Sequence, residues 1–241
     1  MGDPLKAGDN LRWLSRFCWF AARNVEAETH ARAALELLET LPPGRELAMA
    51  CSNLAQLRML AYALDEAVHW GNRALALATD LDDQAIRAHA MNNVGTALMM
   101  QGNSEGRRLL EESIAIARAT GLDDDVTRGY ANLAWSSLEH GEPDTAEQSL
   151  RDGFAFTAER DLSAMELYLR AVHARLMLER GDWDRATREA EFVASSKSSN
   201  THSRIVALTV LGHLGTRRGD DAPALLDEAL VLASSTDHLM R

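Results

Sequence analysis

The chain has 241 residues, of which 46% are apolar and 5% are aromatic, and its formal net charge is −11. Affinity for nucleic acid rests on neutralising phosphates, so this excess of acidic residues argues against direct nucleic-acid binding through this segment. No apolar run approaches the roughly 20 residues that span a bilayer, and Met1 to Lys6 lack a signal-peptide core. We therefore expect a cytoplasmic protein with no membrane partner.

Small or aliphatic residues recur at nearly constant spacing along the whole chain. A fixed period of this kind is the signature of a helical repeat, and here it is longer than the tetratricopeptide period of about 34 residues. The abundance of Ala and Leu also favours closely packed helices over a sheet. The recurring residues, placed in the second helix of each predicted pair, are Ala34, Ala74, Ser113, Gly153, Val193 and Ala229.

The pattern predicts an all-α fold, a right-handed superhelical solenoid of about six helix pairs that forms a single domain over residues 1–241. Gly and Pro punctuation sets the helix boundaries, with Ser104 as one expected N-cap. The predicted first helices cover 11–22, 45–61, 84–101, 124–140, 163–180 and 201–218. The predicted second helices cover 25–41, 64–79, 104–120, from Pro143 onward, 183–194 and 223–233.

Glycine and other small residues have two expected roles in these pairs. In the turns, Gly enters the left-handed region without a Cβ clash and lets two helices fold back on each other. Within the first helices, a small residue marks the point where the two helices of a pair cross. The expected crossing residues are Ala55, Gly95, Ala134, Ala174 and Gly212.

The pattern Asn-Leu-Gly/Ala, Gly-Asp, Ala and Ala-Leu resembles tetratricopeptide repeats, most clearly around Asn53, Asn132 and Gly181. Gly71 and Glu111 depart from it, because the motif usually has an aromatic residue there. The segments LRWLSRFCWF and LPPGRELAMACSNLAQLRML and the turn at Arg180 to Trp183 are similar to the repeat region of large LuxR-type bacterial transcriptional regulators, the ATP-dependent kind related to the maltose regulator.

In that family a nucleotide-binding domain precedes the repeats and a DNA-binding helix-turn-helix follows them. The sequence has no G-x-x-x-x-G-K-[ST] motif and no basic recognition helix. The resemblance therefore implies a fragment of a larger regulator, a non-catalytic module for protein–protein interaction or for sensing a small-molecule inducer. The alternative is a free-standing tetratricopeptide scaffold that binds a partner peptide.

Polar and aromatic residues recur on the face of the first helices that is concave in a tetratricopeptide-like stack. Amides and arginines can hold a peptide backbone or a carboxylate, and aromatic rings add stacking area. An equally simple interpretation is that the Asn residues only hydrogen-bond neighbouring helices. The candidate groove residues are Asn53, Gln56, His89, Asn92, Asn93, Arg128, Asn132, Trp135, Tyr168 and Arg175.

No motif predicts catalysis, a metal site or a cofactor. The Asp clusters at 80–83 and 123–125 fall at predicted helix starts, where carboxylates cap the helix and favour its dipole. Cys18 and Cys51 lie among apolar helix residues and are expected to be buried thiols. The last helix carries Leu230 and Val231 near the end of the sequence, so we also expect weak self-association through the last helix pair.

Overall fold

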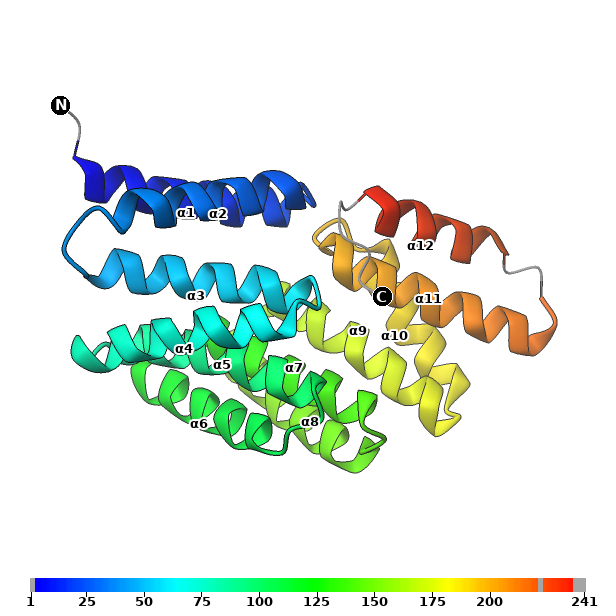
Figure 1. The fold of residues 1–241 in the computed structure, drawn as a ribbon. Helices are drawn as coiled ribbons and strands as arrows, with labels where there is room; N and C mark the ends of the chain where they lie inside the picture. Colours follow the sequence, from blue (N-terminus) through cyan, green and yellow to red (C-terminus); the bar gives the residue numbers. More distant parts are fainter. Residues whose placement is uncertain (1–2, 221–222, 236–241) are drawn as a thin grey trace. The chain divides into compact units, whose positions relative to one another are not determined.

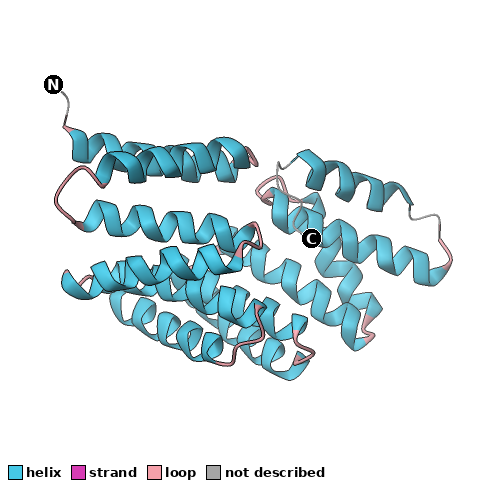
Figure 2. Ribbon diagram, viewed as in Figure 1, coloured by secondary structure: helices cyan, strands magenta, loops and turns pink. Residues whose placement is uncertain are grey.

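The computed structural model describes residues 3–220 and 223–235, and all regular secondary structure in these ranges is helical (Figures 1 and 2). This confirms the predicted all-α class. The helices are α1 (Pro4–Phe20), α2 (Asn24–Leu38), α3 (Arg45–Leu60), α4 (Leu64–Asp80), α5 (Gln84–Met100), α6 (Glu105–Thr120), α7 (Asp123–Glu139), α8 (Pro143–Arg160), α9 (Ser163–Arg180), α10 (Trp183–Ser195), α11 (Thr201–Arg218) and α12 (Pro223–Ser235).

The helices follow one another as six pairs, which we call A and B helices: the odd-numbered helix of each pair is A and the even-numbered one is B. Short connections join the two helices of a pair, so each pair is a helical hairpin. A helices also pack on the A helix of the next pair, as α3 does on α5 and α9 on α11. The architecture is the repeated helical hairpin that the sequence period predicts.

Helix α1 begins seven residues before the predicted start. Asp3 accepts hydrogen bonds from the backbone N–H groups of Leu5 at 3.0 Å and Lys6 at 3.4 Å, and Pro4 occupies the first helical turn. An Asp cap followed by Pro is a strong start signal, because Pro needs no N–H partner there. The apolar periodicity of the helix begins only later, which is why the prediction placed the start too late.

Left-handed residues connect the helices of most pairs, as predicted. Gly102 has a φ of 77° and lies two residues after α5; Gly181 also has a φ of 77° and lies directly after α9. The first two pairs use Ala22 and Tyr62 in the same conformation, with φ of 60° and 57°. Ser104 is the N-cap residue of α6, as predicted, but its side chain makes no cap hydrogen bond; Asn103 accepts from the Glu105 N–H at 3.0 Å instead.

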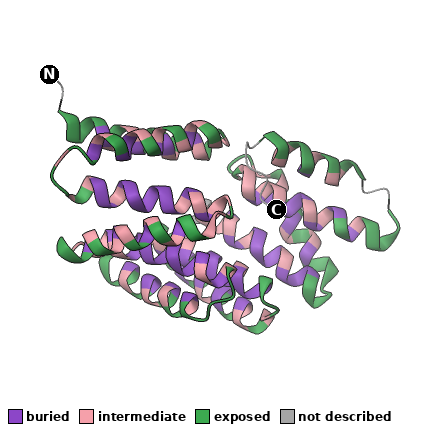
Figure 3. Cartoon of the chain, in the orientation of Figure 1, coloured by how far each residue is buried: buried purple, intermediate pink, exposed green. Residues whose placement is uncertain are grey.

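Small residues lie buried where helices cross, and the buried residues follow the inner faces of the pairs (Figure 3). Contact is closest between α5 and α6. A Cβ added to Gly106 would lie 2.5 Å from the Gly95 carbonyl oxygen and 2.5 Å from the Met99 nitrogen. No side chain fits between the two backbones at this crossing. The repeated small residues in the sequence therefore mark where α5 and α6 pack against each other.

The chain divides into two compact units, an N-terminal unit that runs to Gly129 and a C-terminal unit, Tyr130–Ser235. The single domain over residues 1–241 and the right-handed superhelix therefore stay predictions. No described helix is long and apolar enough to cross a membrane.

In the last helix pair, Leu226 lies against Gly212, whereas Leu230 and Val231 are 60% and 67% exposed. Self-association through this face also stays a prediction, and the sequence after Ser235 lies outside the described residues.

Candidate binding surface of the A helices

The ten candidate groove residues divide into two groups by exposure. Gln56, Arg128, Trp135, Tyr168 and Arg175 are half-buried and reach the surface. The others are almost completely buried, with exposed fractions of 7% or less: Asn53, His89, Asn92, Asn93 and Asn132. A binding role along the A helices therefore rests on the first group.

In the N-terminal unit, two buried Asn side chains join successive A helices. Asn53 on α3 donates from Nδ2 to Ser15 Oγ on α1 at 2.9 Å. Asn93 on α5 donates from Nδ2 to the Ser52 carbonyl oxygen on α3 at 2.9 Å. Each amide satisfies buried polar groups that apolar residues would leave without partners. The contacts match the simpler interpretation of the repeated Asn, which is helix-to-helix bonding.

His89 is buried beside this network and is neutral. Burial, followed by the charges of Arg128, Arg16 and Arg12, holds its pKa well below the usual value of 6.5. Its Nδ1 lies 2.7 Å from Ser52 Oγ and its Nε2 lies 3.5 Å from Arg16 Nη1. A guanidinium can only donate, so Nε2 accepts from Arg16 and the ring proton is on Nδ1.

Arg128 is held by two partners on the same part of the molecule. Its Nη1 donates to Asn93 Oδ1 at 3.0 Å and its Nη2 pairs with Asp125 at 2.9 Å. The sequence placed Arg128 and Asn93 on one face, and the structure brings them into contact. Arg128 thus connects the buried amide network to the surface.

In the C-terminal unit, three rings from successive A helices form an aromatic cluster: Trp135 on α7, Tyr168 on α9 and His202 on α11. The His202 ring centroid lies 5.9 Å from that of Trp135 and 5.7 Å from that of Tyr168, both in edge-to-face geometry. The Tyr168 hydroxyl donates to Asn132 Oδ1 at 3.1 Å, which fixes the ring. Edge-to-face aromatic pairs stabilise such clusters beyond simple burial.

Arg175 covers one side of this cluster. Its guanidinium carbon lies 4.4 Å from the Trp135 ring centroid, a cation–π contact. The same group pairs with Glu139 at 2.5 Å and with Glu179 at 3.1 Å. The predicted residues Trp135, Tyr168 and Arg175 therefore do come together, on one unit of the chain.

Sequence reasoning missed His202. His202 lies ten residues before the crossing residue Gly212, a position that the groove pattern predicted from the sequence does not include. No signal in the sequence marks His202, because α11 begins at the same distance before its crossing residue Gly212 as α7 and α9 do before Ala134 and Ala174. Burial lowers the pKa of His202 to about 4, and its Nδ1 has no hydrogen-bond partner among the described residues.

Stability is expected to fall on acidification through this histidine. The unfolded chain binds the His202 proton near pH 6.5 and the folded chain only near pH 4. The stabilisation that neutral, buried His202 contributes to the folded chain is therefore fully present above pH 6.5 and decreases as the pH falls toward 4. The free energy of unfolding can be measured with urea at pH 7 and pH 5 for the wild type and His202→Gln. Between these two pH values it should fall by about 2 kcal/mol more in the wild type than in the variant. Equal losses in the two proteins would contradict the assignment.

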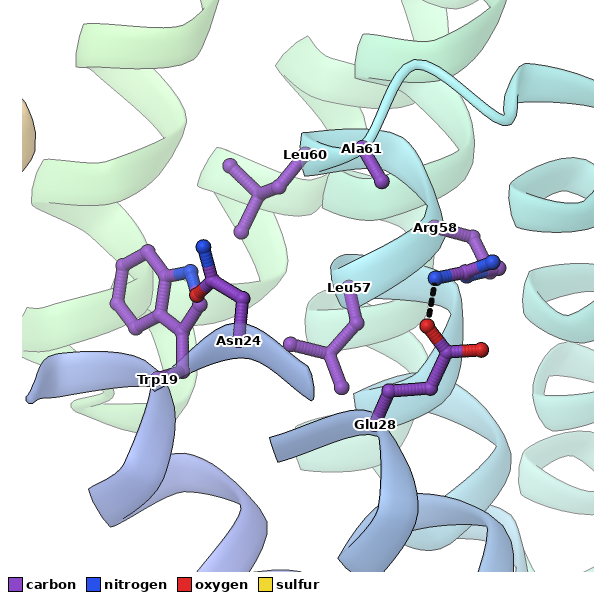
Figure 4. Close-up of a pocket in the computed structure, with 7 residues that line it drawn as sticks. All are labelled: Trp19, Asn24, Glu28, Leu57, Arg58, Leu60 and Ala61. Atoms are coloured by element: carbon purple, nitrogen blue, oxygen red, sulfur yellow. Dashed lines mark hydrogen bonds and ion pairs between the residues drawn. The ribbon is translucent and has the colours of Figure 1, made fainter. Parts of the chain in front are cut away.

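A small pocket lies between the first two helix pairs, and none of the candidate groove residues lines it (Figure 4). Figure 4 shows the ion pair between Arg58 and Glu28 at its edge. The cavity volume is about 30 Å³, which is space for one or two water molecules. It is too small to hold a peptide side chain or a cofactor. The residues around it are Trp19, Asn24, Glu28, Leu57, Arg58, Leu60 and Ala61.

The described residues contain no group of three His, Cys, Asp or Glu side chains placed to hold a metal ion. Cys18 and Cys51 are free and buried, as predicted. Burial raises the pKa of the Cys51 thiol to about 11, so it is protonated and unreactive at neutral pH.

No protein-family model matches the sequence, and the comparison with curated proteins gives no match. Solved structures do match. A Rap protein complexed with competence and sporulation factor aligns with a TM-score of 0.79 and 16% identity over 100% of this chain and 67% of that one. Aspartyl phosphate phosphatase F from Bacillus subtilis aligns with a TM-score of 0.72 and 12% identity over 96% of this chain and 61% of that one.

A third match is the Rap conjugation gene regulator of the plasmid pLS20 in complex with the Phr* peptide. It has a TM-score of 0.63 and 13% identity over 94% of this chain and 73% of that one. Chains with TPR-like repeats are also among the matches. At these identities the similarity establishes the fold alone, and this chain spans only 61–73% of the three structures described.

Proposed function

We propose that this chain is a protein-interaction module that binds an extended peptide segment along its A helices. The observation that carries the proposal is the aromatic cluster, in which three successive A helices each contribute a ring. Half-buried rings offer a large contact area at low conformational cost, which is why aromatic residues dominate peptide and protein interfaces. The solved complex of a structural neighbour with the Phr* peptide supports the same use of this fold.

The narrower hypothesis is the sensor region of a LuxR-type transcriptional regulator that responds to a small-molecule inducer. It rests on the sequence motifs alone, and the structural neighbours favour the scaffold that binds a partner peptide.

Catalysis is not part of the proposal. One structural neighbour is a phosphatase, but a shared fold does not transfer an activity. The aromatic cluster has no nucleophile beside a base: its histidine is neutral, with a pKa of about 4, and Trp135 and Tyr168 surround it.

Selection from a displayed library of random twelve-residue peptides tests the function. The immobilised chain should enrich peptides with a common sequence pattern. Trp135→Ala should then weaken binding of the selected peptide about thirtyfold, because truncation of an interface aromatic costs about 2 kcal/mol or more. Trp183→Ala is the matched control, since Trp183 is an exposed residue on the B helix α10. No enrichment, or equal binding by both variants, would contradict the function.

A further inference from the structure

Arg16 on α1 is half-buried and has no carboxylate within ion-pair distance among the described residues. Its Nε is buried without a hydrogen-bond partner, and its one polar contact is Nη1 to the neutral His89 at 3.5 Å. Partly buried charges are normally paired, because removal from water costs free energy that only a counter-charge offsets. Among the described residues, Arg16 has no such ion pair.

The two neighbouring arginines differ from Arg16 in this respect. Arg12 pairs with Asp9 at 2.7 Å and Arg128 pairs with Asp125 at 2.9 Å. Burial and the positive charges of Arg128 and Arg12 lower the pKa of Arg16, while Asp125 and Asp124 act in the opposite direction. Asp125 forms its ion pair with Arg128, so Arg16 is the one of these three arginines without a carboxylate in ion-pair contact among the described residues.

Aromatic side chains surround the guanidinium on the same face of α1. The Arg16 guanidinium carbon lies 5.8 Å from the centroid of the Trp13 ring and 6.0 Å from the centroid of the Phe20 ring. Trp13, Phe17 and Phe20 follow the i, i+4, i+7 spacing that places residues on one helix face. Their side chains are 44%, 62% and 54% exposed, which leaves a bulky apolar surface open beside the charge.

We infer that Arg16 is a carboxylate-binding residue, and that a peptide bound along the A helices of the N-terminal unit has an acidic side chain or its C-terminus next to bulky apolar residues. This deepens the proposed function and rests on it. The carboxylate supplies the missing counter-charge, and the planar guanidinium can bind its two oxygens together. The neighbouring apolar residues of the peptide cover Trp13, Phe17 and Phe20. His89 acts as a positioning residue, because its Nε2 holds Arg16 in place.

The same peptide selection tests this inference, using a library with free C-termini. Enriched peptides should share a Glu, an Asp or the C-terminal carboxylate next to aromatic or large aliphatic residues. Replacing that carboxylate by its amide should weaken binding about ten- to a hundredfold, the range expected for a charge-assisted hydrogen bond. Arg16→Gln should give the same loss and make the amide and acid peptides bind equally, while Arg16→Lys should restore part of the difference.

Arg188→Gln is the matched control, since Arg188 is exposed on the B helix α10 and loses the same charge. Arg16→Gln should melt within about 2 °C of the wild type, because it removes a charge that no carboxylate pairs with; a large loss of stability would instead indicate a structural role. Selected peptides without a carboxylate preference would overturn this inference and leave the proposed function standing. Failure to select any peptide would count against both. Concentration-dependent dimers that Arg16→Gln abolishes would make a second copy of the chain the occupant and overturn the inference.

Discussion

Asn93→Leu is expected to lower the free energy of unfolding by about 3 kcal/mol. The amide of Asn93 donates to the Ser52 carbonyl at 2.9 Å and its oxygen accepts from Arg128 at 3.0 Å, and the side chain is fully buried. Leucine has a similar volume but removes one hydrogen bond from each of these two partners. Each unsatisfied buried group costs about 1–3 kcal/mol, and the charged Arg128 belongs to the upper part of that range.

Urea unfolding at pH 7 measures this loss, with Asn10→Leu as the control. Asn10 is exposed on α1, and the same substitution there should change stability by about 0.5 kcal/mol or less. If both variants unfold alike, Asn93 does not hold α3 and α5 together, and its repeated position would need another explanation, such as direct contact with a ligand.

Gly106→Ala is expected to be the most destabilising single-methyl change in the described N-terminal unit. The added Cβ would lie 2.5 Å from backbone atoms of both Gly95 and Met99, and backbone cannot move aside as a side chain can. Alanine favours a helix by about 1 kcal/mol over glycine, but overpacking of this kind costs about 3 kcal/mol or more. The helices α5 and α6 must separate or tilt to admit the methyl group.

Thermal unfolding followed by circular dichroism should show a midpoint about 5–10 °C below that of the wild type. Gly44→Ala is the matched control, because the nearest atom to its new Cβ would be Glu46 Oε2 at 3.6 Å, an ordinary contact. A Gly106→Ala protein that melts with the control would show that α5 and α6 do not cross at Gly95 and Gly106.

The fold was predictable because spacing and punctuation act locally. The prediction reproduced the bounds of α9 and α11, where Gly181 and Gly219 end the helices in the left-handed conformation. The start of α1 was missed, since its cap, Asp3, precedes the first apolar residues of the pattern. Local signals therefore predict where helices end better than where an N-terminal helix begins.

The candidate site was predictable only in part, because a repeat position does not specify exposure. The side chains of Trp135, Tyr168 and Arg175 do lie together. Asn53 and Asn93 occupy equivalent positions in successive A helices, but both are buried and hydrogen-bonded to the preceding A helix. Whether a polar side chain faces solvent or a neighbouring helix depends on the packing between pairs. The sequence pattern of one helix does not contain that information, and this is also why His202 escaped notice.

The central claim is that the A helices form the peptide-binding surface, and a map of backbone amide chemical-shift changes tests it most directly. The ¹⁵N-labelled chain would be titrated with the selected peptide and with the same residues in scrambled order. We predict that the changes fall on the A helices, above all around Trp135 and Tyr168. Changes confined to the even-numbered B helices, or equal changes with the scrambled peptide, would contradict the account.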